Sequence, residues 1–485
     1  MDWETVIGIE VHCQLKVPSK LFCECATSFG ADANTNVCPV CLGLPGSLPV
    51  LSERALRLAI RAGLSLGCEI AARTKWDRKN YFYPDLPKGY QISQYDMPLS
   101  FGGAIEVPLE DGGAKTVRIT RLHLEEDTGK LFHVEAEDAG SRESLVDLNR
   151  AGTPLIEIVT EPDIRSPGEA WSYLTELRRI LRYIDVSDCN MEEGSLRAEP
   201  NVSIRPKGSK EFGTKTEIKN LNSFKSVRDA LVHEVDRQRK TIEGGGNVRQ
   251  ETLLWDVARG VTAPMRSKEA AHDYRYFPEP DVPPVTVPRV LVDETRRSVP
   301  ELPGPRRARF EKDYGLPAYD ADVLCSDRAT ADWFEAVVKA HPSDPKAASN
   351  WVMGEVLREV KERKIEISSF PVSPASLARL LALAEAGTVS VSAAKEAWKE
   401  MVASGADAET AIERKGLAQV SDEAAIDGLV AKVVASNEKI AAEIRGGKVA
   451  ALKSLVGLVM RESKGRANPQ MVNAALRRSL GLPPE

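Results

Sequence analysis

Prolines gathered in one segment divide this chain into two parts of different character. Eight of its 30 prolines fall among the 28 residues from Pro278 to Pro305. Because proline fixes φ and lacks a backbone donor, this density predicts an extended connection that contains no helix. We therefore expect the main domain boundary here, with mixed strands and helices before it and helices after it.

Several segments of the first part alternate polar and apolar residues. Residues 9–15, 201–205 and 215–219 alternate apolar side chains with Glu, His, Asn, Arg or Lys. This period of two predicts strands with one polar face. A solvent-facing strand would show the same pattern, but several such strands together indicate one shared polar cavity.

The part after the prolines has helical periodicity. Ser373 and Pro374 begin one apolar stripe that ends at Gly387, and Ser421 begins another. A capping serine, an early proline and a closing glycine are the usual signals of helix ends. A polar break around Gly405 divides this helical part in two.

Length and charge narrow the class of protein. The 485 residues suit about three domains. Lys and Arg total 65 against 71 Asp and Glu, a net charge of −6 that excludes a globally basic nucleic-acid coat but allows a local basic patch. No apolar run is long enough for a transmembrane helix, and the acidic N-terminus fits neither a signal nor a transit peptide. We expect a cytoplasmic protein.

Four of the eight cysteines lie in a CxC…CxxC pattern, at Cys23, Cys25, Cys38 and Cys41. Two close pairs of thiolates suit a tetrahedral zinc ion, and a site filled by four protein ligands is structural. Unpaired thiols in a loop are the alternative. The other four cysteines stand alone and are expected to be small buried hydrophobic residues.

Familiar nucleotide and hydrolase motifs are missing. The sequence has no GxxxxGK[ST] loop, no GxGxxG fingerprint after a strand and no HExxH helix. A nucleotide would therefore be held by charge and metal. The Gly/Ser-rich loop of an amide-hydrolysing Ser-Lys site is also absent, so ammonia would come from another protein.

Acidic residues and one histidine form a candidate magnesium site. Glu10 and His12 point the same way on one strand, Glu125 begins an acidic run, Glu157 interrupts an apolar strand, and Glu192 lies in a turn-rich stretch. Carboxylates with one imidazole suit Mg²⁺ or Mn²⁺ better than zinc. Surface acids and salt bridges are the alternative for any single glutamate.

Aromatic and basic residues suggest contacts with nucleic acid. Residues 76–95 and 272–281 interleave aromatics with Lys and Arg, a combination that can stack bases or merely pin loops. From Arg445 to Arg478 there are eight cations and one acid. Such a segment in an acidic chain suggests contact with a phosphate backbone, with a solvated helix face as the alternative.

Six longer motifs resemble the GatB family of aspartyl/glutamyl-tRNA amidotransferase subunits. They span residues 4–12, 77–85, 122–127, 147–157, 215–224 and 273–281, and residues 464–469 resemble the YqeY-like tail of that family. The resemblance implies an α+β fold: a cradle related to glutamine synthetase over residues 1–295, with the zinc element at 23–41, then an all-α domain over 296–405 and an all-α YqeY-like tail over 406–485.

The resemblance also implies a reaction and partners. ATP would phosphorylate the side-chain carboxylate of Glu misacylated onto tRNA(Gln), or of Asp on tRNA(Asn), and ammonia would displace the phosphate. The inserted domain of a related archaeal protein is not found, which favours the bacterial heterotrimer. There, GatA hydrolyses glutamine and channels ammonia to GatB, while GatC braces the pair.

Site residues are carried over by position. Glu10, His12 and Glu125 would bind Mg²⁺, with Glu157, Glu192 and Glu217 as secondary ligands, and Arg150, Lys215 and Lys219, beside Glu217, would bind ATP or the transferred phosphoryl group. Lys79, Tyr81 and Lys88 would line the route of ammonia or the tRNA 3′ end. Arg445, Lys448, Lys453, Lys464 and Arg466 would contact tRNA.

Two other functions fit the same residues. One is a zinc-containing tRNA-binding scaffold without catalysis, in which the acidic residues are structural. The other is an ATP-dependent amide ligase that acts on a small acid without tRNA, which leaves the basic tail unexplained.

Overall fold

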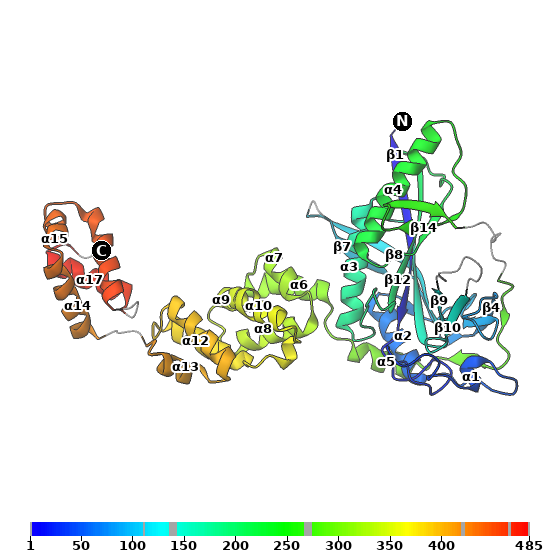
Figure 1. The fold of residues 1–485 in the computed structure, drawn as a ribbon, viewed down its shortest axis with the longest axis horizontal. Helices are drawn as coiled ribbons and strands as arrows, with labels where there is room; N and C mark the ends of the chain where they lie inside the picture. The colour runs from blue at the N-terminus through cyan, green and yellow to red at the C-terminus, as the bar shows by residue number, and fades with distance from the viewer. Residues whose placement is uncertain are drawn as a thin grey trace. The chain divides into compact units, whose positions relative to one another are not determined.

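A computed structural model describes residues 2–109, 112–134, 143–265, 274–418, 422–463 and 467–483. The chain divides into two compact units, Met1–Pro305 and Arg306–Glu485. The first contains a mixed sheet with helices and the second contains helices (Figure 1). The expected α+β class is confirmed. The domain limits at 295 and 405 and the relation to glutamine synthetase stay predictions.

One ten-stranded sheet organises the described part of the first unit. Its order is β15-β14-β13-β12-β1-β11-β8-β6-β2, with β7 paired to β8. Neighbouring strands are antiparallel except β13 and β14. The strands are β1 Trp3–Gln14, β2 Glu69–Ile70, β6 Ser100–Phe101, β7 Ala104–Pro108, β8 Ala114–Glu126, β11 Pro154–Thr160, β12 Leu196–Pro206, β13 Thr216–Lys219, β14 Thr252–Asp256 and β15 Val261–Pro264. The strands predicted from the alternating segments are confirmed.

Helices cover one face of this sheet. Apolar residues of α2 (Glu53–Ser65), α3 (Pro167–Tyr183) and α4 (Phe224–Glu243) share one core with Ile7, Ile9, Val11 and Cys13 of β1. Burial of these side chains stabilises the unit by roughly 25 cal/mol per Å² of apolar surface. Because successive strand residues face opposite sides, Glu10, His12 and Gln14 project from the other face.

Three small sheets accompany the main one in the part of the chain that the structure describes. They pair β9 (Lys130–Val134) with β10 (Glu143–Asp147), β3 (Arg73–Thr74) with β17 (Val285–Thr286), and β16 (Phe277–Pro278) with β4 (Asp77–Asn80) and β5 (Tyr90–Ser93).

The three-stranded sheet brings the two aromatic segments together. Tyr95 stacks on Tyr276 with ring centroids 4.2 Å apart, and the Tyr81 and Tyr274 rings lie 5.9 Å apart. His272 and Asp273, part of the second segment, lie outside the described residues. These aromatic rings therefore pack against each other.

The expectation that the proline-rich segment contains no helix is wrong. Helix α5 (Arg289–Ser298) lies within it, and α6 begins at Pro303. No proline occurs between Pro288 and Pro300, and Pro288 is the N-cap of α5. A proline at a helix start removes only a donor that would have no partner in the helix, so this spacing permits one short helix.

The described residues of the second unit form two separate hydrophobic cores. One includes residues from Phe310 to Ile412 and the other from Ile426 to Leu480. The helices are α6 Pro303–Tyr314, α7 Ala318–Leu324, α8 Arg328–Ala340, α9 Pro345–Trp351, α10 Leu357–Arg363, α11 Pro374–Glu385, α12 Val391–Ser404, α13 Ala408–Lys415, α14 Glu423–Ser436, α15 Glu438–Arg445, α16 Leu452–Glu462 and α17 Pro469–Leu480. No helix of the described ranges is long and apolar enough to cross a membrane.

Two predicted helix boundaries can be compared with the structure. Ser373 caps α11, as predicted, because its side chain accepts a hydrogen bond from the Ser376 amide. Gly405 ends α12 in a left-handed conformation, but α13 still packs in the first of the two cores, which therefore divide after α13. Ser421 lies outside the described residues, and Asp422 caps α14.

Glu335 of α8 joins three side chains in the first helical core. It accepts hydrogen bonds from Arg309 (2.7 Å) and Tyr314 (2.9 Å), and it forms an ion pair with Arg306. Burial raises the pKa of Glu335, but these partners outweigh burial and lower the pKa to about 2.

We predict that Glu335→Gln removes a pH-dependent part of the stability. A carboxylate with a depressed folded pKa stabilises the fold above its unfolded pKa of ~4.3, and this contribution is lost as the pH falls toward about 2. We expect a loss of roughly 1–2 kcal/mol at pH 7 that shrinks below about pH 4, measured by denaturant unfolding of the full chain. Glu366→Gln, at an exposed site, is the control; parallel pH profiles for wild type and Glu335→Gln would contradict the prediction.

Candidate functional site

The register of four strands aligns polar residues in one row across the sheet. His12 of β1 lies opposite Arg197 of β12 on one side and Glu157 of β11 on the other. Glu157 in turn lies opposite His123 of β8. Directly opposed residues in antiparallel strands share a face, so these side chains project together. Glu125, two residues beyond His123, is on the same face.

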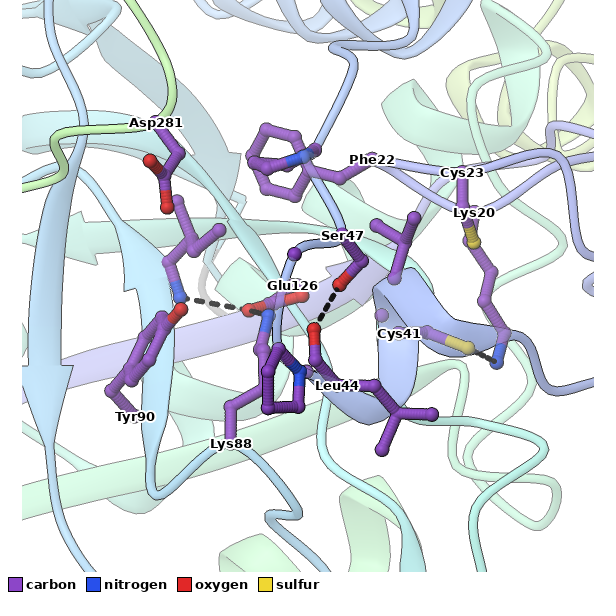
Figure 2. A pocket seen from close by; sticks show the side chains of 17 residues that line it. Lys20, Phe22, Cys23, Cys41, Leu44, Ser47, Lys88, Tyr90, Glu126 and Asp281 are labelled. Carbon is purple, nitrogen blue, oxygen red and sulfur yellow. Dashed lines mark hydrogen bonds and ion pairs between the residues drawn. The ribbon is translucent and has the colours of Figure 1, made fainter.

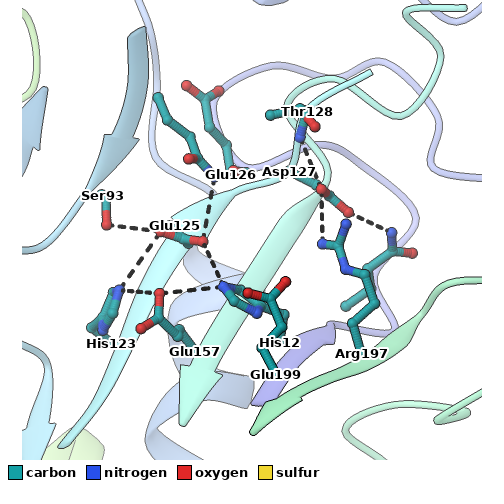
Figure 3. Close-up of polar contacts among 12 residues, drawn as sticks. His12, Ser93, His123, Glu125, Glu126, Asp127, Thr128, Glu157, Arg197 and Glu199 are labelled. Atoms are coloured by element: carbon teal, nitrogen blue, oxygen red, sulfur yellow. Dashed lines mark hydrogen bonds and ion pairs between the residues drawn. The ribbon is translucent and has the colours of Figure 1, made fainter. Parts of the chain in front are cut away.

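Two imidazoles and two carboxylates converge in this row (Figure 3). His12 Nε2 is 3.4 Å from Glu157 Oε2 and 3.8 Å from Glu125 Oε1. His123 Nε2 is 3.3 Å from Glu157 Oε2 and 3.6 Å from Glu125 Oε2. One ligand atom from each of His12, Glu125 and Glu157 lies within 4.8 Å of the others, a spacing that could hold a metal ion. We call these three residues, with His123, the acidic cluster.

The acidic cluster needs positive charge. Glu125 and His123 are only 1% and 2% exposed, and an unpaired buried carboxylate is costly. Burial lowers the pKa of His123, but Glu157 and Glu125 outweigh it and raise the pKa to about 9. The Nδ1 atom of His123 is buried without a hydrogen-bond partner among the described residues. A divalent cation could replace the imidazolium charges, and these oxygen and nitrogen donors suit Mg²⁺ or Mn²⁺.

Strand β5 holds Glu125 in place. Ser93 donates a hydrogen bond to Glu125 Oε2 (2.9 Å), and Gln91 donates to Oε1 (3.3 Å). Tyr81 donates a hydrogen bond to Gln91 at 2.9 Å, so a series of hydrogen bonds connects Tyr81 to Glu125 through Gln91. Lys79 lies opposite Gln91 in the pairing of β4 with β5. Burial lowers the pKa of Lys79, but Glu125 and Glu157 raise it above its usual range, so Lys79 stays protonated.

Arginines and an aspartate continue the row on one side. Arg197 donates a hydrogen bond to Asp127 Oδ1 at 2.9 Å, and Gln14 donates one to Asp127 Oδ2 at 2.8 Å. Arg150 Nε is 3.7 Å from the same carboxylate and donates to the Thr128 carbonyl at 3.0 Å. Arg150 and Glu192 line an open cavity of about 520 Å³. We call it the large cavity.

On the other side lie the remaining predicted ligands. Asn201 donates to Glu10 at 3.2 Å, and burial raises the pKa of Glu10. Lys219 Nζ is 3.2 Å from Glu199 and 3.6 Å from Glu217. Lys215 is exposed and lines a different cavity from Arg150.

The predicted residues thus fall into separate groups. His12, Glu125 and Glu157 form one cluster. Glu10 instead lines the cavity that contains Lys215, Glu217 lies beside Lys219, and exposed Glu192 lines the large cavity. His123 was not predicted as a ligand, although its i,i+2 spacing from Glu125 in a strand could have indicated it. Sequence reasoning missed Glu199 and gave no role to Asp127 or Arg197, because the partners that compensate their charges are distant in sequence.

The four clustered cysteines form a second candidate metal site. Sulfur atoms of Cys23, Cys25, Cys38 and Cys41 lie within 4.8 Å of one another, and all four are free thiols. The completely buried Lys20 donates to Cys41 Sγ at 3.5 Å and to the carbonyl oxygens of Asn36 (2.7 Å) and Leu148 (3.4 Å). A buried ammonium favours thiolates, so this donor set suits zinc.

A cavity of about 200 Å³ lies between this cysteine element and β5 (Figure 2). Lys88 forms a buried ion pair with Glu126, and the Ile92 amide donates to Glu126 at 2.9 Å. Glu126 follows Glu125 directly in β8, so the backbone of this strand separates the cavity from the acidic cluster.

The basic tail is partly neutralised by local acids. Arg445 pairs with Glu438 (2.7 Å) and Lys448 with Glu443 (3.0 Å). Lys453 is exposed on α16. The predicted contacts Lys464 and Arg466 lie outside the described residues. Exposed pairs of this kind contribute little to stability and can exchange for phosphate.

Comparison with known proteins identifies two family domains. Residues 5–293 match the GatB/GatE catalytic domain, and residues 332–480 match the GatB domain. Three relatives are named as the B subunit of an aspartyl/glutamyl-tRNA(Asn/Gln) amidotransferase. The proteins of Moorella thermoacetica and Carboxydothermus hydrogenoformans are each 52% identical, over 99% of this chain and 100% and 99% of their own lengths. That of Chlorobaculum tepidum is 50% identical over 99% of this chain and 100% of its own. With this coverage and the acidic cluster on its polar sheet face, the chain belongs to the GatB family.

Proposed function

We propose that this chain catalyses the ATP-dependent amidation of Glu on tRNA(Gln), Asp on tRNA(Asn), or both. The observation that carries the proposal is the acidic cluster, where His12, Glu125 and Glu157 converge in a chain of the GatB family. A carboxylate is a poor electrophile, so a phosphoryl group must activate it before ammonia attacks. A site for this step needs a cation near the phosphate and fixed positive charge around it.

Residues of this chain could supply both a site for the cation and the fixed positive charge. His12, Glu125 and Glu157 would hold Mg²⁺, with Glu10, Glu192 and Glu217 as ligands of lesser support because they lie outside the cluster. Bound Mg²⁺ would neutralise phosphate oxygens. Lys79 supplies a permanent cation beside Glu125 and Glu157. Lys219 and Lys215 on one side and Arg150 on the other are the remaining candidates to bind phosphate or the substrate carboxylate.

The names of the relatives, which describe one subunit of an enzyme, support an assembly. We assign the supply of ammonia to a GatA-type protein and the bracing role to a GatC-type protein in the cytoplasm. The cavity of Figure 2, with Lys88 and Glu126 in its wall, is a candidate segment of the ammonia route, since only β8 separates it from Glu125. Zinc on the four cysteines would fix the neighbouring loop, because Lys20 ties Cys41 to the Leu148 carbonyl.

We predict that Glu125→Gln abolishes product formation. The full chain would receive ATP, Mg²⁺, ammonium chloride and Glu-tRNA(Gln), and Gln-tRNA(Gln) would be scored. Loss of a charged ligand from a buried site should lower the rate at least ~100-fold. Glu106→Gln, at an exposed acid of β7 that lies outside the cluster and the cavities described above, should retain most of the activity.

The same assay separates the alternative functions. Activity of Glu125→Gln equal to wild type would overturn the proposed role of the cluster. No product from wild type, even with co-purified GatA and GatC, together with intact tRNA binding would support the scaffold function. Turnover of free glutamate without tRNA would support a small-acid ligase.

We predict that zinc stabilises the fold without taking part in the reaction. Metal analysis should give about one zinc per chain in wild type and little in Cys38→Ser. The melting temperature should fall by roughly 5 °C or more, at about 2–4 °C per kcal/mol, while the folded variant keeps residual specific activity. Glu24→Gln, between two of the cysteines, should keep its zinc; a folded Cys38→Ser chain that binds tRNA but has lost all catalysis would contradict a structural role.

We predict that Lys453→Ala weakens tRNA binding in a salt-dependent way. Removal of one phosphate contact should reduce the slope of log K against log salt by about 0.7–1. The measurement is binding of a tRNA(Gln) transcript to the full chain at several salt concentrations. Lys339→Ala, an exposed cation on α8, is the control, and an unchanged slope for Lys453→Ala would count against contact at this residue.

A further inference from the structure

The loop between the two cysteine pairs is joined to a segment that is far away in the sequence. We call residues 23–41 the cysteine element and residues 146–152 the arginine loop, after the one arginine that it contains. Asn34 of the cysteine element donates a hydrogen bond to the Val146 carbonyl oxygen at 2.9 Å and accepts one from the Leu148 amide at 2.8 Å. Its side chain therefore pairs with the arginine loop as the backbone of a neighbouring strand would.

Asn149 makes the reciprocal contacts from the arginine loop. Its Oδ1 atom accepts a hydrogen bond from the Asn36 amide at 2.8 Å, and its Nδ2 atom donates one to the Asp32 carbonyl oxygen at 2.7 Å. The backbone groups of each segment are thus satisfied by side chains of the other, so each segment holds the conformation of its partner. A change in the cysteine element is therefore transmitted to the arginine loop.

A buried lysine makes a third connection between the two segments. Lys20 is fully buried, and its ammonium group donates to Cys41 Sγ at 3.5 Å and to the carbonyl oxygens of Asn36 (2.7 Å) and Leu148 (3.4 Å). An ammonium group has three donors, so all of them are used here. A buried cation is costly without a compensating negative charge, and thiolates around a zinc ion would supply that charge. Lys20 thus belongs both to the candidate zinc site and to the support of the arginine loop.

The arginine loop is held on both sides of Arg150. Gly152 packs against the stem of Lys20, where a Cβ atom would lie 3.4 Å from Lys20 Cδ. The Gly152 carbonyl oxygen accepts a hydrogen bond from the Leu21 amide at 2.8 Å. Because Leu148 is also held, the backbone is fixed two residues before and two residues after Arg150.

The position of this backbone decides where the Arg150 guanidinium lies. The guanidinium donates to the carbonyl oxygens of Thr128 (3.0 Å) and Gly129 (2.6 Å) and lines the large cavity. It is 3.7 Å from Asp127, a carboxylate that it shares with Arg197. Displacement by ~1 Å of a group that orients a substrate can lower the rate about 100-fold.

From these contacts we infer that the cysteine element positions Arg150, with Lys20 and Asn34 as the positioning residues. Neither of them is among the described residues that line the large cavity, so both act through the arginine loop. Zinc on the cysteines would stiffen the cysteine element and thereby hold Arg150 toward an oxyanion, either a phosphate or the substrate carboxylate. The inference rests on the proposed function, which supplies this oxyanion.

The first test removes the pairing but none of the metal ligands. Asn34 has a φ of +61°, which glycine adopts easily, so Asn34→Gly removes both side-chain hydrogen bonds without straining the backbone. In the full chain, hydrogen exchange in the peptide of residues 146–152 should become about 10-fold faster, while about one zinc per chain is retained. Zinc removal from wild type should accelerate the same exchange. Asn247→Gly, at an exposed residue after α4, is the control, and unchanged exchange in either experiment would overturn the inference.

A second test concerns the metal site. Lys20→Met should weaken zinc binding roughly 10- to 100-fold in a chelator competition, as loss of a group that contacts a metal ligand commonly does. In the cobalt-loaded chain it should also shift the thiolate-to-cobalt absorption band, because the hydrogen bond to Cys41 is lost. Lys16→Met, at an exposed lysine that pairs with Asp185, is the control. A zinc affinity and a cobalt spectrum equal to those of wild type would contradict the role of Lys20.

A double-mutant cycle connects the pairing to catalysis. Asn34→Gly should lower kcat/KM for Glu-tRNA(Gln) roughly 10-fold in the wild-type chain but less than ~2-fold in an Arg150→Ala chain, where no guanidinium is left to displace. Equal fold losses in both chains would refute action through Arg150. If wild type forms no product even with its partner proteins, the proposed function fails, whereas the exchange experiment still decides whether the cysteine element holds the arginine loop.

Discussion

Strand β1 is hydrogen-bonded on both sides, to β11 and to β12, and this pairing fixes which of its side chains reach the site. In the observed register, His12 stands between Glu157 and Arg197. A slip of one residue would turn His12 into the apolar core and bring Val11 to the polar face. The apolar residues of β1, packed against α2, α3 and α4, make that slip costly. The hydrophobic core thus sets the geometry of the acidic cluster.

The same row explains why so many charges can be buried together. His12 and His123 each lie beside both Glu125 and Glu157, and Arg150 and Arg197 both lie beside Asp127. Each carboxylate has at least one cationic neighbour and often a neutral donor such as Ser93 for Glu125. Buried charges are tolerated only when they are paired and hydrogen-bonded. A cluster of this kind keeps its side chains in fixed positions, which suits the cation binding that we propose, because little rearrangement would be needed.

Much of the fold and part of the candidate site could be predicted from the sequence, and the predictions that failed did so for physical reasons. The alternation of polar and apolar residues predicted β1, β12 and β13, because successive residues of a half-buried strand face the core and the polar side in turn. His123 was missed as a cluster member because its i,i+2 spacing from Glu125 shows only that the two residues share a face. That this face meets Glu157 depends on the pairing between β8 and β11, which no local pattern encodes. The helix α5 was missed because proline density conceals the proline-free stretch after Pro288. The surface pairs of Arg445 and Lys448 reduce the free charge that a simple count suggests.

The order of residues along β1 also constrains how two large substrates could meet. Cavities open toward both ends of this strand: Glu10 lines one, Gln14 lines the other, and His12 of the acidic cluster lies between these two residues. The proposed transfer of a phosphoryl group needs the attacking and leaving oxygens roughly in line, so ligands in these two cavities would have to meet close to the acidic cluster. Ammonia would then need a third direction of approach. The cavity beside Lys88 and Glu126 lies across β8 from Glu125 and shares no lining residue with either of the other two.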